Sequence, residues 1–265
     1  MKLGIISYSF EREEFERIRA LGLDFVEFCV NADAENRFQE FYDRADEMKR
    51  NLDELGLEVG SVGRWAGNKI LPDGSENPEE YRADTTLMRA AARMGCPVYV
   101  TSCNYVEELS LYENYTAAIH YFEKLLELGR ELGLKVATCN CRWNNYVCCD
   151  PAWDVIHGYL KDLYIKYDPS HCVYDGGNYL SEMKKWGKRF AHVHIKGSLV
   201  IDGERFDDPP AGLDQTDWGA FMATLYANGY DGTLAIEPHS SVWQGELGEL
   251  GVKYTTDMMR KLILR

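Results

Sequence analysis

The chain has 265 residues, a length that suits one large domain, and 45% of them are hydrophobic, which excludes a disordered protein. It carries 29 Lys and Arg against 43 Asp and Glu, a formal net charge of −14. This excess of acid repels a phosphate backbone, so we expect no nucleic-acid partner and no membrane binding. No stretch approaches the roughly 20 apolar residues of a membrane span, and no signal-peptide layout is visible, so we expect a cytoplasmic protein.

Short β-branched and aromatic runs alternate with longer amphipathic runs along the chain. The short runs predict strands at 3–7, 25–29, 58–62, 98–102, 135–139, 164–167, 192–195 and 234–237. Helical spacing of apolar residues is clearest at 38–55, 115–132, 218–228 and 254–264. Gly22, Gly56, Gly133 and Gly229 stand just before predicted strands, where the end of a helix favours a residue with positive φ.

Eight strands in alternation with about eight helices predict parallel strands joined by right-handed crossovers. The simplest such α/β fold is a single-domain (β/α)8 TIM barrel over residues 1–265. An open doubly wound sheet is the rival, but the glycine-rich phosphate turn that often follows its first strand is missing at 7–10. The long connection 196–216 shows no regular pattern, and such loops are often functional.

The eight cysteines are expected to be reduced and mostly buried, as in other cytoplasmic proteins. Cys139, Cys141, Cys148 and Cys149 form a local cluster. Their spacing lacks the two C-x₂-C pairs of a zinc ribbon, so we do not expect a structural zinc site.

Polar residues gather where the predicted strands end, which is where the active site of a barrel lies. Glu27, Asp168, His194 and Glu237 are among them. Asp, His and Glu recur on the last three strand ends, and carboxylate oxygens with imidazole nitrogens suit a divalent ion such as Mn²⁺, Mg²⁺, Co²⁺ or Zn²⁺.

Each of these residues also has a simple structural interpretation. Asp168 precedes a proline and could begin a turn or cap a helix. His192 and His194 lie two apart in one strand, so they share a face and could both be packing residues. Glu237 could be a surface carboxylate.

Other side chains near the strand ends could contact a ligand. The aromatic candidates for stacking on a sugar ring, or for packing at the rim, are Tyr8, Trp65, Trp143 and Trp243. Arg64 and Arg142 could hold a carboxylate or phosphate through two hydrogen bonds, or could pair with the many acids of the chain.

Three segments carry a family resemblance. Residues 167–171 read Y-D-P-S-H, residues 192–196 read H-V-H-I-K, and residues 210–218 begin P-A-G-L-D, with G-Y-D-G and I-E following within 229–237. In order and spacing they resemble the xylose-isomerase-like TIM barrel superfamily, the sugar phosphate isomerase/epimerase group. The chain departs from the third motif at Asp214, where a second glycine is usual.

The resemblance implies roles for five residues. Asp168, His194 and Glu237 would ligate a divalent metal. His171 would reach a substrate oxygen, and Lys196 stands where the family often has a lysine beside the site.

The family's first ligand, a glutamate that ends strand five, is absent. Cys139 falls at its position and Asn140 follows. We favour Asn140 as the fourth ligand, because an amide oxygen suits a hard ion whereas a thiolate would select zinc. Of the two histidines, His194 is the predicted ligand, and His192 should lie one layer deeper in the barrel.

The resemblance favours a metal-dependent sugar isomerase or epimerase that acts on a small keto-sugar or polyol through an enediolate. The predicted catalytic residues are Glu237, His171 and Lys196. Substrate contacts are expected from Arg64, Trp65, Arg142, Trp143, His171 and Lys196. Barrels of this group are often dimers or tetramers, so a homo-oligomer is also expected.

Two alternatives stay open because only one of the family's two glutamates is present. A metal-dependent lyase, either a dehydratase or a deglycosylase acting on a keto-sugar, would need a single base. A non-catalytic sugar-binding protein with a degenerate site would need none. A phosphodiesterase of the DNA-repair branch is disfavoured by the net charge of −14.

Overall fold

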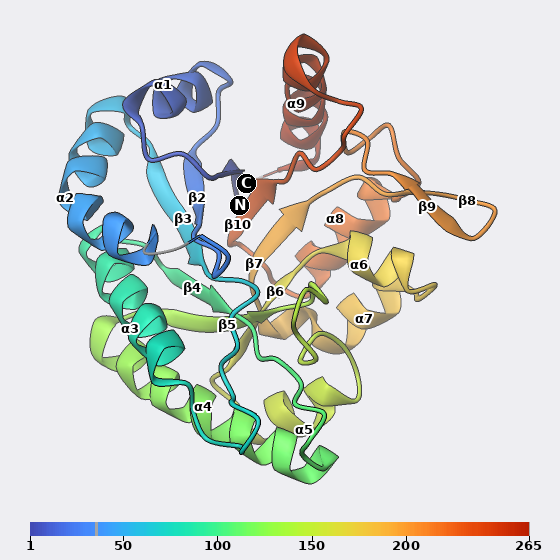
Figure 1. Cartoon of the computed structure of the whole chain (residues 1–265). Coiled ribbons are helices and arrows are strands. Elements are labelled where there is room, and N and C mark those ends of the chain that lie inside the picture. The colour runs from blue at the N-terminus through green and yellow to red at the C-terminus, as the bar shows by residue number, and fades with distance from the viewer. Residues whose placement is uncertain (35–36, 265) are drawn as a thin grey trace.

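The computed structural model describes residues 1–34 and 37–264, and a closed ring of parallel strands forms its centre (Figure 1). The ring order is β1-β10-β7-β6-β5-β4-β3-β2. Its strands are β1 (Lys2–Ser7), β2 (Phe25–Cys29), β3 (Glu58–Gly63), β4 (Val98–Thr101), β5 (Lys135–Cys139), β6 (Tyr164–Tyr167), β7 (Phe190–Ile195) and β10 (Thr233–Ile236). The predicted (β/α)8 barrel is therefore confirmed.

Helices surround the barrel (Figure 1). They are α1 (Arg12–Ala20), α2 (Arg37–Leu55), α3 (Pro78–Arg93), α4 (Leu111–Leu132), α5 (Ala152–Tyr159), α6 (Pro169–Tyr174), α7 (Tyr179–Trp186), α8 (Trp218–Ala227) and α9 (Gly245–Leu262), with a 3-10 turn at Gly187–Arg189. None of the helices in the described ranges is both long enough and apolar enough to cross a membrane.

The last helix begins earlier than the sequence predicts, at Gly245 rather than at 254. Glycines lower helix propensity, so the glycine-containing segment 245–253 is not predicted to be helical from the sequence. The structure shows why one of them is there: a Cβ on Gly251 would lie 2.5 Å from the ring of Pro210. Close packing of α9 against the loop that contains Pro210 therefore outweighs the low helix propensity of glycine.

The connection 196–216 is not wholly irregular, which corrects the expectation from the sequence. It contains an antiparallel hairpin of β8 (Leu199–Ile201) and β9 (Glu204–Asp207). Asp202 and Gly203 form its turn with φ of 54° and 83°. Asp-Gly with both residues at positive φ is a strong hairpin signal.

Phe25 fills the floor of the barrel interior. A Cβ on Gly4 would lie 2.4 Å from its ring, and one on Gly60 would lie 2.2 Å away, so both neighbouring strands need glycine to admit it. The ring of His192 lies above it, edge-on, with centroids 6.1 Å apart. The polar side chains of the barrel interior therefore rest on an apolar floor.

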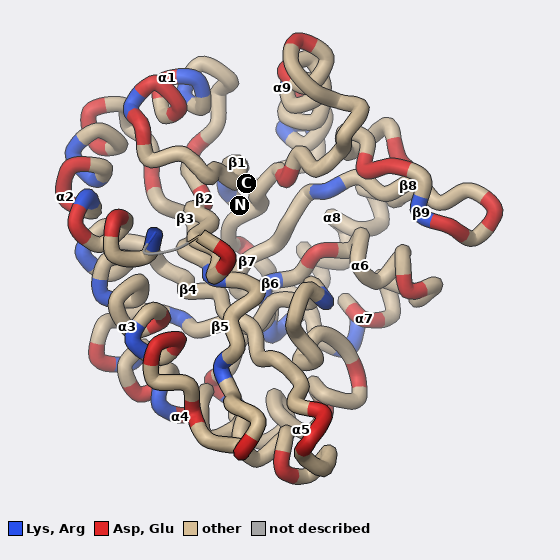
Figure 2. Tube along the Cα trace, in the orientation of Figure 1, with Lys and Arg blue, Asp and Glu red and all other residues tan. Residues whose placement is uncertain are grey.

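The outer surface is mixed in charge. Acidic and basic segments alternate along α1 to α4 (Figure 2). All eight cysteines are unpaired, as expected, and only Cys141 and Cys149 are not fully buried.

His157 of α5 provides a test of the fold through pH. Its buried Nε2–H donates to the carbonyl of Tyr164 at 3.2 Å, and burial lowers its pKa from 6.5 to about 3. His157 takes up a proton near pH 6.5 in the unfolded chain but only near pH 3 in the folded chain. The free energy of unfolding therefore falls as the pH drops from about 6.5 towards 3. One such group contributes a slope of up to about 1.4 kcal/mol per pH unit.

We expect His157→Gln to have a shallower loss of unfolding free energy between pH 6.5 and 4.5 than the parent, measured by urea unfolding. His120→Gln, at an exposed position on α4, is the control and should keep the parent's slope. An equal slope for His157→Gln and the parent would show that His157 is not held neutral.

Candidate functional site

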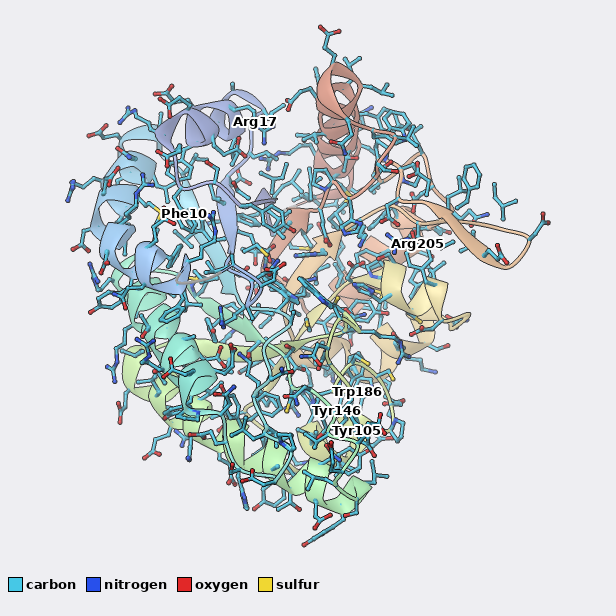
Figure 3. All side chains as sticks on the ribbon, in the orientation of Figure 1. Phe10, Arg17, Tyr105, Tyr146, Trp186 and Arg205 are labelled. Carbon is cyan, nitrogen blue, oxygen red and sulfur yellow. The ribbon has the colours of Figure 1, made fainter. Side chains whose placement is uncertain are left out.

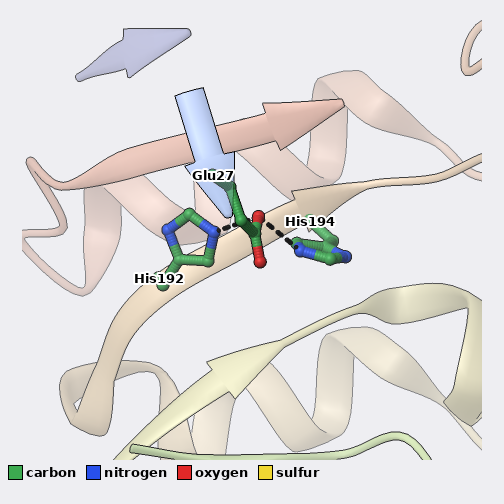
Figure 4. A group of neighbouring side chains, drawn as sticks. All are labelled: Glu27, His192 and His194. Carbon is green, nitrogen blue, oxygen red and sulfur yellow. Dashed lines mark hydrogen bonds and ion pairs between the residues drawn. The ribbon is translucent and has the colours of Figure 1, made fainter. Parts of the chain in front are cut away.

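Glu27 lies fully buried inside the barrel, and both histidines of β7 contact it (Figure 4). Nε2 of His192 and Nε2 of His194 lie 2.7 and 2.8 Å from the same carboxylate oxygen, Oε2. Burial alone would raise the pKa of Glu27, but the two imidazoles lower it well below its ordinary value. Because β2 and β7 are not neighbours in the ring, these hydrogen bonds cross the barrel interior.

The shared carboxylate fixes the direction of both rings. Nδ1 of His192 lies 2.6 Å from the hydroxyl of Thr233, at the start of β10. Nδ1 of His194 lies 2.7 Å from Oε2 of Glu237, just beyond the end of β10. His192 is therefore the deeper of the two, as strand alternation predicts, and His194 faces the mouth.

Asp168, His194 and Glu237 meet at the mouth, with one ligand atom of each within 4.8 Å of the others. Oδ1 of Asp168 accepts the backbone N–H of Ser170 and caps α6, so the structural interpretation of this residue also holds. Its other oxygen, Oδ2, is buried and has no hydrogen-bond partner within the described ranges. Two carboxylates and an imidazole with one oxygen left unpaired fit a divalent cation.

Charge at the mouth is balanced by a lysine. Nζ of Lys196 lies 3.8 Å from Oε1 of Glu237. Burial would raise the pKa of Glu237, but Lys196 and His194 bring it well below its usual range. Burial would likewise raise the pKa of Asp168, but His171, Lys196 and Lys166 lower it. Both carboxyl groups are therefore ionised at neutral pH.

His171 faces the same space from α6. Its Nε2 lies 3.5 Å from Oδ2 of Asp168. Burial lowers its pKa to about 4, although the negative charge of Asp168 works in the other direction. The ring is neutral at pH 7, so it can donate or accept a hydrogen bond from a ligand oxygen.

A pocket of about 930 Å³, open to solvent, lies over these groups. Five of the predicted substrate contacts line it: Trp65, Arg142, Trp143, His171 and Lys196. Arg205 of β9, which is labelled in Figure 3, also lines it. Its guanidinium lies over the ring of Tyr174, 4.7 Å from the centroid. The hairpin in the long connection therefore contributes to the pocket wall.

Arg64 does not line this pocket, which corrects its prediction as a substrate contact. Its guanidinium lies 2.7 Å from Glu80 of α3, on the outer side of the barrel. Successive strand residues face opposite ways, so Trp65 reaches the pocket and Arg64 cannot. Trp243 also lies elsewhere, at a smaller hollow beside α9.

The side chain of Asn140 is hydrogen-bonded to the backbone of Asp168. Its Oδ1 accepts the Asp168 N–H at 2.9 Å, and its Nδ2 donates to the Asp168 carbonyl at 2.7 Å. Its role as a fourth ligand stays a prediction, whereas its role in holding the end of β6 is direct. Cys139 is fully buried, and burial raises the pKa of its thiol to about 12, so it carries no thiolate at neutral pH.

Two residues were missed as site residues in the sequence. Glu27 was visible only as one of several polar strand ends. Lys166 stands two residues before Asp168 in a buried strand, so the two share a face, and that spacing was a usable signal.

The chain belongs to the xylose isomerase-like TIM barrel family, whose model matches residues 15–262. None of the curated proteins compared with it matches.

Solved structures repeat the fold across nearly the whole chain. The 3-keto-D-glucoside 4-epimerase from E. coli, in its apo form, has a TM-score of 0.76 and 18% identity, covering 98% of this chain and 99% of its own. A D-psicose 3-epimerase studied in the presence of D-fructose has a TM-score of 0.76 and 14% identity, covering 99% of each chain. The probable 3-DHS dehydratase AsbF from Bacillus anthracis has a TM-score of 0.75 and 14% identity, covering 98% of this chain and 99% of its own. At these identities the likeness establishes the fold.

Asn140→Ala tests how Asp168 is positioned. It leaves the N–H and carbonyl of Asp168 without their partner, so we expect a loss of about 1–3 kcal/mol in unfolding free energy. Asn140→Asp keeps an acceptor but loses the donor, and it should also be less stable than the parent. Asn51→Ala, on the outer helix α2, is the control for urea unfolding and should lose less. Parent-like stability of Asn140→Ala would contradict the positioning role.

Proposed function

We propose that the chain is an enzyme that moves a proton on the carbon next to the carbonyl of a small keto-sugar. In the favoured form it is a metal-dependent isomerase or epimerase that works through an enediolate. The observation that carries the proposal is an ionised Glu237 set between His194 and Lys196 in an open pocket, with the unpaired oxygen of Asp168 beside it.

Asp168, His194 and Glu237 are the proposed ligands of the divalent ion. Such an ion, when bound, polarises a carbonyl and stabilises negative charge on enediolate oxygens. Its identity among Mn²⁺, Mg²⁺, Co²⁺ and Zn²⁺ is left to experiment.

The two oxygens of Glu237 have different surroundings, which suits a base. Oε2 is held by His194 at 2.7 Å, whereas Oε1 has Lys196 at 3.8 Å. Oε1 is the oxygen that would take the substrate proton. The neutral ring of His171 and the ammonium of Lys196 would hold substrate oxygens, and general-base catalysis of this kind contributes about 10²–10⁴-fold.

A lyase is the second candidate, because one observation favours it. Among the described residues that line the pocket, Glu237 is the only carboxylate, and the thiol of Cys139 keeps its proton. A single base is enough to begin elimination of a hydroxyl group β to the carbonyl. The similarity to a probable dehydratase fits the same first step.

Incorporation of solvent deuterium tests the proposal. With Mn²⁺ in D₂O, the protein should place deuterium on the carbon next to the carbonyl of at least one of D-fructose, D-tagatose and D-allulose, as read by NMR. Glu237→Gln should lower this rate by about 10²–10⁴-fold, since it removes the base. Glu246→Gln, at an exposed position on α9, is the control and should match the parent.

The product separates the candidates. Isomerisation or epimerisation gives a new ketose or aldose, whereas elimination gives an enone with ultraviolet absorbance. Binding of a keto-sugar with neither deuterium incorporation nor elimination would contradict the enzymatic proposal and leave a sugar-binding protein.

A further inference from the structure

Lys166 of β6 lies in an unusual electrostatic position. Its side chain lines the pocket, yet the residue is only 2% exposed. Within the described ranges no carboxylate lies within 4.0 Å of its ammonium, and the nearest defined contact is the ring of Trp65, 5.9 Å away. A buried ammonium with no carboxylate in contact is costly, so this arrangement favours an anion from outside the chain.

The other deeply buried lysines show the contrast. Lys69, also fully buried, lies 2.8 Å from Asp84 and 3.0 Å from Glu80. Lys196 has carboxylate oxygens of Glu237 and Asp208 at 3.8 and 3.9 Å. The fold thus places carboxylates in contact with these lysines but not with Lys166.

The strands on either side of Lys166 cannot supply an acid. Its neighbour on β5 is Cys139, and its neighbour on β7 is His192. The Cys139 thiol is protonated, and both ring nitrogens of His192 are already engaged, by Glu27 and Thr233. The space left is the pocket itself.

The lining of the pocket has more basic than acidic side chains although the chain carries a net charge of −14. Its described lining includes Lys166, Lys196, Arg142 and Arg205, against Glu237 as the one carboxylate. Arg142 is paired with Asp175 and Arg205 with Asp208. Lys166 is therefore the one lysine or arginine of this lining with no carboxylate oxygen within 4.0 Å in the described ranges, and Asp168 and Glu237 act on its charge only from farther away.

We propose that the pocket selects an anionic substrate, a keto-sugar acid whose carboxylate pairs with Lys166. This substrate class rests on the function proposed above, since it concerns the same pocket. Residues two apart in a strand lie about 7 Å from each other on one face, so Lys166 and Asp168 fix the distance between the anionic group and the reacting centre.

That short distance favours a carboxylate carried on the sugar chain itself over a terminal phosphate. A carboxylate next to the keto carbon reaches Lys166 while the carbonyl lies near Asp168. A phosphate at the far end of the sugar would instead lie nearer Arg142 and Arg205, both of which are partly exposed.

Binding to a matched pair of ligands tests the proposal. 2-Keto-D-gluconate is D-fructose with a carboxylate in place of the first hydroxymethyl group. Titration calorimetry in a chelator, so that the α-keto acid cannot bind through a metal, should show at least tenfold tighter binding of the acid than of D-fructose. Lys166→Met should lose that tenfold preference, Lys166→Arg should keep part of it, and Lys184→Met, at an exposed position on α7, should leave it unchanged.

The contrary outcomes are specific. Equal affinity of the parent for 2-keto-D-gluconate and D-fructose, with and without Mn²⁺, overturns the proposal without using any variant, so a poorly folded Lys166→Met cannot mask the result. An unchanged preference in folded Lys166→Met also overturns it. Tighter binding of D-fructose 6-phosphate than of the acid, dependent on Arg142, overturns it in favour of a phosphorylated sugar. None of these results bears on deuterium exchange, so the two proposals fail separately.

Discussion

A carboxylate buried inside a barrel needs hydrogen-bond donors, and Oε2 of Glu27 has two of them in the histidines of β7, whereas its Oε1 has no partner in the described ranges. Taking an ionised carboxylate out of water costs several kcal/mol unless donors replace the lost hydration. Here both N–H groups converge on one oxygen, and the ring of Phe25 packs against His192 below them. The same hydrogen bonds turn Nδ1 of His194 towards the mouth, so the orientation of a proposed ligand depends on a charge one layer beneath it.

The mouth itself is assembled by backbone contacts as much as by side chains. Asn140 from the end of β5 pairs with the backbone of Asp168, and the carboxylate of Asp168 caps α6. The other oxygen of Asp168, Oδ2, has no hydrogen bond in the described ranges, and its near neighbour is Nε2 of His171 at 3.5 Å. Lys196 and His194 then hold Glu237 ionised beside it. The result is two ionised carboxylates side by side, with His194 and Lys196 as positive groups close to Glu237.

Much of this could be read from the sequence, because buried parallel strands leave a strong local pattern. The strands, the barrel and the convergence of Asp168, His194 and Glu237 all followed from apolar runs and the polar residues that end them. The early start of α9 did not, because its glycines serve a contact with Pro210 that local propensity cannot show.

The roles of Glu27 and Lys166 also escaped sequence reasoning. Glu27 depends on partners across the barrel, which no local spacing encodes. The spacing of Lys166 and Asp168 indicates that the two share a face, but it does not show that the Lys166 ammonium has no carboxylate in contact within the described ranges. The prediction that Arg64 contacts the substrate was wrong for a simpler reason. Arg64 and Trp65 both follow the end of β3, but successive residues face opposite sides, and Arg64 faces Glu80.

The proposed metal position is tested most directly by anomalous diffraction from crystals grown with saturating Mn²⁺. Two groups share His194, one at the mouth with Asp168 and Glu237 and one deeper with Glu27 and His192. Because the rings already donate to Glu27, the mouth should hold the ion. The expected result is one peak about 2.0–2.6 Å from Nδ1 of His194 and from carboxylate oxygens of Asp168 and Glu237. A peak between Glu27 and His192, or none at the mouth, would contradict it.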